Sequence, residues 1–372
     1  MSNIMMLFVD LCLGVVVGNR GLLSSTAPSM AAIALRARSA QALLPVDGFI
    51  LALIAVVLGA SMLPCHGNSA RVFGALGQFA IAVLFFLQGA RLSRDAILKG
   101  LTHWRLHAFV AATTFVLFSL LGLGLLAAWP HLLPHKLWMG VLFCCALPST
   151  VQSSIALTSM ARGNVAAAIC SASISNIAGI VLAPLLFGAM SHLHGGGINV
   201  AAIGQVATQL LVPFCAGHLS RPWLGAWAER NRPVLAITDR SSILLIVYTA
   251  FSAAVVRGIW QSIPPVTLIV LGLVVAVLLV SALAAILAGS RLLGFDRADE
   301  AAMVFCGSQK SLVSGVPIAN ALFSAGAIGP ILLPIMLYHP MQLLVCTWIA
   351  RYYARGQGGE NSGVPAPRAG RH

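Results

Sequence analysis

Charged side chains are scarce in this 372-residue chain. Asp, Glu, Lys and Arg together make up 8% of the residues, and only 9 residues are acidic. A soluble domain carries about 25% charged residues. Here hydrophobic residues reach 59% and the mean hydropathy is +0.93. This composition excludes an ordinary soluble protein and predicts an all-α polytopic membrane protein that has the lipid bilayer as a partner.

Metal-binding and catalytic patterns are also missing. The 8 cysteines form no CxxC and no Cys/His spacing suited to zinc, so we expect buried thiols that pack as small hydrophobes. No acidic pair is available for acid–base chemistry. Ser311 directly follows Lys310, and neighbours on a helix point about 100° apart, which argues against a Ser–Lys nucleophile. We expect no enzyme, no metal and no cofactor.

Ten apolar stretches have the length of about 20 residues that crosses a bilayer. They lie near residues 46–63, 72–91, 106–128, 137–159, 164–189, 198–219, 238–257, 265–289, 299–323 and 325–350. They predict a ten-helix membrane domain over residues 42–355.

The two ends of the chain fall outside this domain. Residues 5–18 are apolar but too short to span, and they lack the basic start and cleavage site of a signal peptide. We treat residues 1–41 as a poorly defined extension that lies at the membrane interface. The alternative is that translation starts at Met30. The polar, Gly/Pro-rich residues 356–372 predict a disordered cytoplasmic tail.

Lysines and arginines are distributed unevenly between the two sides of the predicted domain. Of the 22, 18 fall on the side that holds both termini, and Arg71, Lys136 and Arg257 fall on the other. The positive-inside rule therefore predicts two cytoplasmic termini in a bacterial-type inner (plasma) membrane. These loop cations account for the net charge of +13, so we expect no nucleic-acid partner.

Ten spans divide into two halves of five, near residues 42–192 and 196–353. An odd number of spans gives the halves opposite orientations, which is the inverted-repeat plan of many secondary transporters. Segment 144–164, which begins within the fourth span, and segment 304–317 of the ninth are rich in small and polar residues, and each contains a Gln-x-Ser pattern. Prolines follow in the fifth and tenth spans. Interrupted helices at matching positions predict a transport site.

Lys310 lies within the ninth of these spans. A charge at the bilayer centre costs about 2.5–3.5 kcal/mol on insertion scales, so such a residue faces a protein interior or a watery cavity. No Asp or Glu is expected at comparable depth. We expect the ammonium group to point into a polar chamber that the two interrupted spans share.

Other polar residues are expected to converge on this chamber. Ser171 and Ser175 share one face of the fifth span because they are four residues apart, and Asn176 lies one position further round. His339 is either a site residue or an interhelical hydrogen-bond partner, and the small polar residues could likewise serve as interhelical packing. The candidate binding residues are Ser149, Thr150, Gln152, Ser153, Ser154, Ser171, Ser175, Asn176, Gln309, Lys310, Ser311 and His339.

The segments ALPSTVQSSIALTSMARGN (146–164), GSQKS (307–311) and LPIMLYHPMQ (333–342) resemble the SBF-like branch of the bile acid:sodium symporter family. The resemblance covers residues 42–355. It implies a bile acid symporter or cation-proton antiporter-like fold. In that fold a panel of spans 1, 2, 6 and 7 packs on a core of spans 3–5 and 8–10, and the broken fourth and ninth helices cross.

The resemblance also implies a sodium site from which this chain departs. Sodium-coupled members carry a glutamate four residues before the Gln of the ninth helix, where this chain has Phe305. Thr113 or Thr114 stands where those members have a Gln in the third helix. Lys310 stands where they have a neutral residue directly after the Gln of the ninth helix. These departures argue against sodium coupling, although the family name includes sodium. Coupling to sodium or to protons stays open at this point.

We expect a secondary active transporter that moves a small organic anion by alternating access, with Lys310 supplying the charge that bound sodium supplies in relatives. Lys310 either stays protonated, giving uniport or exchange, or releases its proton during the cycle, giving proton coupling. The alternative function is a non-transporting membrane regulator of ion homeostasis. The sequence leaves the identity of the substrate and the oligomeric state open.

Overall fold

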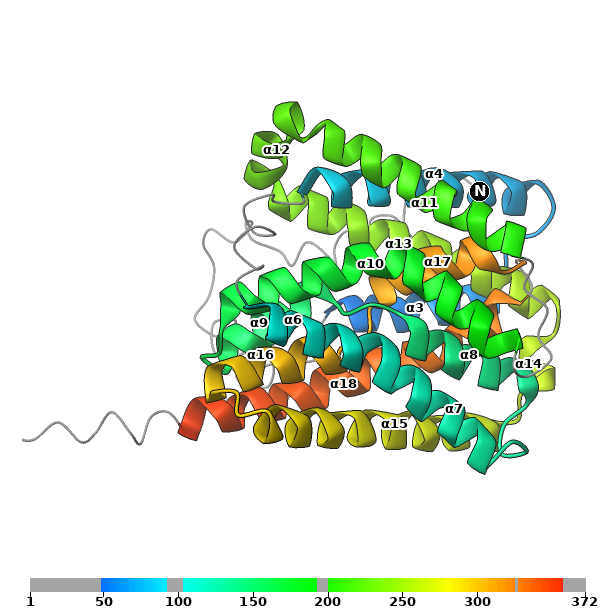
Figure 1. Cartoon of the computed structure of the whole chain (residues 1–372). Helices are drawn as coiled ribbons and strands as arrows, with labels where there is room; N and C mark the ends of the chain where they lie inside the picture. The colour runs from blue at the N-terminus through cyan, green and yellow to red at the C-terminus, as the bar shows by residue number, and fades with distance from the viewer. Residues whose placement is uncertain (1–47, 92–102, 193–199, 325–326, 357–372) are drawn as a thin grey trace, which may run out of the picture. The chain divides into compact units, whose positions relative to one another are not determined.

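The structure, a computed structural model of the full chain, describes residues 48–91, 103–192, 200–324 and 327–356. All regular secondary structure in these ranges is helical (Figure 1). The predicted N-terminal extension (1–41) and nearly all of the predicted tail (356–372) lie outside the described residues.

The chain divides into two compact units, and the first takes in residues 1–92, 199–268 and 315–333. Its helices are α3 (Gly48–Met62), α4 (Asn68–Arg91), α11 (Val200–Leu219), α12 (Arg221–Arg230), α13 (Arg232–Val256) and α14 (Ile259–Ser262). Within this unit α4 lies beside α11, and α13 packs on α3 and α4.

The second unit takes in residues 93–198, 269–314 and 334–372. It holds α6 (Trp104–Ala111), the π-helix η2 (Ala112–Leu117), α7 (Phe118–Ala128), α8 (His135–Ala146), α9 (Val151–Met160), α10 (Val165–His192) and α16 (Arg297–Ser308). Three helices have residues in both units: α15 (Pro265–Leu292), α17 (Leu312–Leu322) and α18 (Ile328–Gly356).

Six helical stretches of the described chain are long and apolar enough to cross a membrane. They are Asn68–Arg91, Trp104–Ala128, Val165–Ser191, Pro233–Val256, Pro265–Leu292 and Ile328–Arg355. The helices α8 and α9 qualify together as a span bent by 61°, while α3 is apolar but shorter. These findings confirm the all-α polytopic membrane protein. The count of ten spans and the inverted repeat stay predictions.

The grouping of helices agrees with most of the panel and core that the family resemblance implies. Helices from expected spans 1, 2, 6 and 7 fall in the first unit, and those from spans 3–5 fall in the second. Residues 315–333, which join the expected spans 9 and 10, group with the first unit instead.

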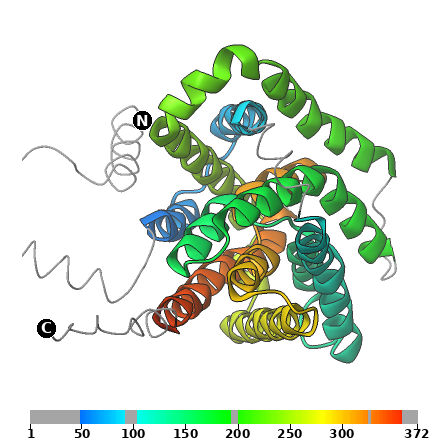
Figure 2. The same ribbon diagram turned by 60° about the vertical axis from the view of Figure 1, so that its left-hand side comes forward.

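Small side chains bring α16 close to its neighbours in the second unit. Ala167, Ala168 and Ala172 of α10 are buried against Ala302 and Met303 of α16. Small residues allow helix backbones to approach closely in membrane proteins. Figure 2 shows α16 in gold beside the yellow α15 and the red end of α18. This packing fixes the helix that ends just before Lys310.

The turn between α9 and α10 contains the ARGN element and also binds α16. Arg162 has a φ of 57°, a left-handed conformation that is uncommon outside glycine. A Cβ on Gly163 would lie 2.7 Å from the Cβ of Ala301. Asn164 caps α10 by accepting from the N–H of Ala167 at 3.0 Å, and its own N–H donates to the Ala298 carbonyl at 2.9 Å. The ARGN element is thus explained by turn geometry and contact with α16.

We predict that Gly217→Ala destabilises the protein although Ala is the better helix former. A Cβ on Gly217 would press into the backbone carbonyl of Phe86 on α4, and such overpacking typically costs about 1–3 kcal/mol. Gly204→Ala on the same helix is the control, because nothing lies within 4 Å of its added Cβ. The thermal unfolding midpoints of both variants in detergent test this. Equal midpoints would contradict the close α4–α11 contact.

Candidate functional site

The first helix break lies between α8 and α9 and spans residues 147–150. Leu147 is extended, with φ −69° and ψ 149°, because the residue before a proline is disfavoured in helical geometry. Pro148 then packs on α10, where a Cβ on Gly179 would lie 2.5 Å from the Cβ of Pro148. The proline therefore interrupts the span, and a glycine makes room for the interruption.

The second break lies between α16 and α17 and spans residues 309–311. Gln309 is extended, with φ −75° and ψ 140°. Ser311 begins α17 as an N-cap, because its hydroxyl accepts from the N–H of Ser314 at 3.1 Å. The predicted interruptions of the fourth and ninth spans are both present.

The two breaks bind each other directly. The N–H of Ser311 donates to the Pro148 carbonyl at 2.9 Å, and the Thr150 hydroxyl donates to the Lys310 carbonyl at 2.9 Å. The Ser153 hydroxyl donates to Oε1 of Gln309 at 2.7 Å. Backbone groups that a break removes from helical hydrogen bonding need new partners in an apolar medium. Here each break supplies partners for the other.

Lys310 is fully buried at the meeting of these breaks. Its Nζ donates to the main-chain oxygens of Thr114 at 2.6 Å, Cys145 at 2.7 Å and Leu147 at 2.8 Å. We call these three oxygens the carbonyl cage. The ring of Phe118 covers the ammonium group, with its centroid 4.1 Å from Nζ. An ammonium has three N–H donors, so the cage uses all of them.

The cage carries negative partial charge for identifiable reasons. Cys145 and Leu147 lie at the C-terminal end of α8, where helix carbonyls lack intrahelical partners and the helix dipole is negative. Thr114 lies in the π-helix η2, an irregularity that is frequent at functional sites. Charge-assisted hydrogen bonds and the cation–π contact offset the cost of removing the ammonium from water.

Gln342 of α18 holds the backbone of Lys310. Its Oε1 accepts from the Lys310 N–H at 2.7 Å, and its Nε2 donates to the Lys310 carbonyl at 2.9 Å. His339, one turn earlier, lies 3.4 Å from the same carbonyl and 2.9 Å from the Gln342 amide. The hydroxyl of Tyr338 donates to the carbonyl of Ser308 at 2.8 Å. Sequence reasoning included His339 among the candidates but not Gln342, although Gln342 ends the segment LPIMLYHPMQ that carries the family resemblance.

Most of the remaining candidates lie around the first break. The N–H of Ser149 donates to the Ser175 hydroxyl at 3.1 Å, and the Ser149 hydroxyl lies 3.3 Å from that of Ser154. Ser154 donates to the Phe305 carbonyl at 3.1 Å. Asn176 accepts from the Ser314 hydroxyl at 2.7 Å. These contacts join the first break, α9, α10, α16 and the start of α17 in one polar network.

Two candidates lie apart from this network. Ser171 is 2.7 Å from Nδ1 of His107 on α6. Gln152 is exposed in the first turn of α9, whereas Gln309 is buried within the second break. The shared Gln-x-Ser letters therefore do not mark equivalent positions. The last residues of the two breaks are Thr150 and Ser311.

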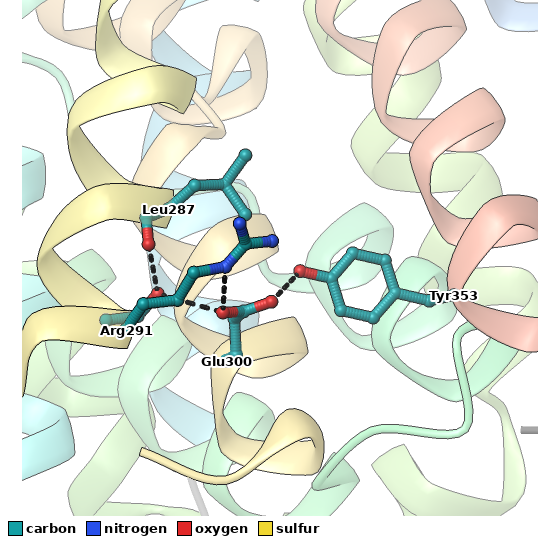
Figure 3. Close-up of polar contacts among 5 residues, drawn as sticks. Leu287, Arg291, Glu300 and Tyr353 are labelled. Atoms are coloured by element: carbon teal, nitrogen blue, oxygen red, sulfur yellow. Dashed lines mark hydrogen bonds and ion pairs between the residues drawn. The ribbon is translucent and has the colours of Figure 1, made fainter. Parts of the chain in front are cut away.

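The start of α16 is held by a second polar cluster. Glu300 accepts from Nε of Arg291 on α15 at 3.0 Å and from the hydroxyl of Tyr353 on α18. Figure 3 shows Arg291 and Tyr353 on opposite sides of this carboxylate. The nearby Asp299 accepts from the Asn164 amide at 2.8 Å. Glu300 is buried and has an arginine partner, but it lies at the start of α16, ten residues before Lys310. The expectation that no Asp or Glu lies as deep in the membrane as Lys310 stays a prediction.

No group of three or more His, Cys, Asp or Glu side chains that could hold a metal occurs in the described part of the chain. The seven cysteines there are free, and five of them are buried. The described site therefore consists of neutral hydrogen-bonding groups around one cation.

A comparison with known protein families identifies the class of protein to which this chain belongs. The model of the SBF-like CPA transporter family (DUF4137) matches residues 47–355. This chain belongs to that family. It is accordingly a membrane protein of a transporter family and not an enzyme.

Relatives in several organisms share most of their length with this chain. An uncharacterized protein of Pseudomonas aeruginosa is 54% identical over 312 residues, which cover 83% of this chain and 93% of the relative. A protein of Escherichia coli named "Putative symporter YfeH" is 50% identical over 311 residues, covering 83% and 93%. "Sodium/bile acid cotransporter 7-B" of Xenopus laevis is 28% identical over 312 residues, covering 80% and 89%.

We predict that Gln342→Leu loosens the second break. The substitution removes both hydrogen bonds to the Lys310 peptide, and a buried polar group without a partner costs about 1–3 kcal/mol. Faster hydrogen–deuterium exchange in a peptide that covers residues 304–317, together with a lower unfolding midpoint, is the expected result. Leu344→Met, at an exposed position of the same helix, is the control. Exchange unchanged from the parent protein would show that Gln342 does not hold the break.

Proposed function

We propose that this protein is a secondary transporter that moves a small organic anion without sodium. Lys310 acts as a permanently bound cation in the carbonyl cage. The proposal includes ten spans in two inverted repeats, with both termini in the cytoplasm of an inner membrane. The observation that carries it is the coordination of the buried ammonium by three carbonyl oxygens. This coordination resembles that of a bound metal ion more than that of a substrate-binding lysine.

The electrostatics of the two breaks favour an anion as the substrate. Lys310 neutralises the C-terminal end of α8, whereas the N-terminal end of α9 has no side-chain cap. The first turn of α9 is partly accessible at Val151, Gln152 and Ser153. Free N–H groups and the helix dipole at such an end attract a carboxylate, sulfonate or phosphate. The permanent cation strengthens this bias. Because Lys310 neutralises the negative end of α8, that end does not cancel the positive end of α9.

The names of relatives agree with an organic anion. Two relatives are named as a symporter and as a sodium/bile acid cotransporter, and bile acids are organic anions. The sodium in the second name does not carry over, because Phe305 stands where the resemblance implies a sodium-binding glutamate, and because a lysine fills the cage. Alternating access, with the second unit moving as a body, follows by analogy with other inverted-repeat transporters.

A non-transporting regulator of ion homeostasis is the second candidate. One observation favours it: Lys310 uses all three donors on the carbonyl cage, which would lock the breaks together. The two candidates differ in solute binding. A thermal-shift screen of purified protein with taurocholate, glucose 6-phosphate and pyruvate, with and without sodium, separates them. A ligand whose effect is lost in Lys310→Met supports transport, and the absence of any ligand supports the regulator.

We predict that flux of the anion found in this screen does not respond to ion gradients. The fixed ammonium replaces a coupling ion, so counterflow in proteoliposomes should proceed equally with sodium, potassium or choline outside. An imposed pH gradient should also leave the rate unchanged. Stimulation by a sodium gradient would overturn the proposal. Stimulation by a proton gradient would indicate instead that Lys310 releases its proton during the cycle.

We predict that Lys310→Ala creates a vacant cation site. Three buried carbonyl oxygens lose their donor, so the free energy of unfolding should fall by about 3 kcal/mol or more. Methylammonium chloride or sodium chloride should restore part of the unfolding midpoint, whereas choline chloride should not, because choline has no N–H donors and is too large. This measurement needs no substrate.

Lys136→Ala is the matched control, because Lys136 is exposed at the start of α8. It should change neither the midpoint nor the response to the three salts. A Lys310→Ala variant as stable as Lys136→Ala, with no response to methylammonium, would refute the cage as a cation site.

A further inference from the structure

The short helix α12 has a different character from the membrane-spanning helices of the first unit. It is ten residues long, or about 15 Å at 1.5 Å per residue, half the thickness of the hydrocarbon core. It follows α11 directly and precedes the span Pro233–Val256. Figure 1 shows α12 where the chain turns from α11 to α13. Its place and length fit the surface of a bilayer and not its interior.

The two faces of α12 differ in what they contact. Ala228 is buried, with 2% of its surface exposed, and the helix packs against α4, α11 and α13. The opposite face carries Trp223, which is 79% exposed, and Trp227, which is 48% exposed. Arg230 is exposed as well. Positions 223, 227 and 230 follow one another at helical spacing, so they form a single stripe.

The chemistry of this stripe matches the headgroup region of a membrane. Tryptophan concentrates at membrane–water interfaces, where its ring is apolar and its N–H remains hydrated. Arginine binds phosphate through several N–H groups at once. Arg221 begins the helix and Arg230 ends it, and Glu229 is the only acid within it. The positive-inside rule places the connection between α11 and α13 on the side of the membrane with most of the Lys and Arg residues. Anionic lipids on that side attract these cations.

We propose that α12 lies in the membrane interface and binds the phosphate of an anionic phospholipid. Arg230, at the end of the exposed stripe, contacts the phosphate, and Trp223 and Trp227 enter the boundary between headgroups and acyl chains. The partly exposed Arg221, at the other end of the helix, adds positive charge. This site is independent of the anion that the protein is proposed to transport, because it uses only residues of the first unit. It anchors the connection between α11 and α13 to one leaflet.

The test uses the full chain in nanodiscs of phosphatidylcholine alone or mixed with phosphatidylglycerol. We expect phosphatidylglycerol to raise the thermal unfolding midpoint, and the double variant Arg221→Gln/Arg230→Gln to lose at least half of that rise. The matched control is Arg71→Gln/Arg257→Gln, because these two arginines of the first unit are exposed and predicted to face the opposite leaflet. The control should keep the full rise.

Two further measurements distinguish binding of a lipid from binding of free phosphate. Inorganic phosphate added to phosphatidylcholine nanodiscs should give no rise, since the aromatic anchors require a lipid. Brominated phosphatidylcholine should quench the tryptophan fluorescence of the parent protein. It should quench less fluorescence in the variant Trp223→Phe/Trp227→Phe. The proposal is overturned if phosphatidylglycerol gives no rise, if both arginine pairs lose it equally, or if the two tryptophans contribute nothing to the quenching.

Discussion

The contact of the Lys310 ammonium with three main-chain oxygens is the interaction on which the second unit depends. Interrupting a membrane helix frees carbonyl groups that lipid cannot satisfy. The break after α8 leaves the Cys145 and Leu147 oxygens in this position, and the π-helix η2 adds that of Thr114. One side chain with three donors satisfies all of them. The same contact makes a buried lysine tolerable, because its charge is solvated by backbone dipoles instead of by water.

The backbone of Lys310 is held as closely as its side chain. Gln342 binds both sides of the Lys310 peptide, and Thr150 binds its carbonyl from the first break. A shift of α16 along its axis would therefore disturb the cage, the clamp on α18 and the contact with α9 together. The Glu300 cluster at the other end of α16 opposes such a shift, because it ties the helix to α15 and α18. The second unit is thus built to keep one geometry.

Sequence reasoning could predict the helices, both breaks and Lys310, because each has a signal in composition: apolar length, proline with small polar residues, and a charge in a span. It could not predict the carbonyl cage, since main-chain oxygens carry no residue signature. The sequence also did not show at which residues each break begins and ends. Gln152 and Gln309 share a pattern of letters, but Pro148 ends α8 earlier in its segment, so that only Gln309 lies in a break. Gln342 was missed because an amide in an apolar helix is more often packing than a clamp.

Each buried charge among the described residues has a partner within the protein, and this bears on whether transport is coupled to an ion. Asp239 is paired with Arg91 at 2.6 Å, and Glu300 with Arg291 at 3.0 Å, while Lys310 is solvated by backbone oxygens. A coupling ion binds where a protein leaves charge or lone pairs unsatisfied. Each of these groups already has an internal partner, so an ion would have to displace a protein group to bind. No side chain caps the first turn of α9, so an anion placed there would meet no such competition, and this asymmetry is the physical basis for proposing an anion that moves alone.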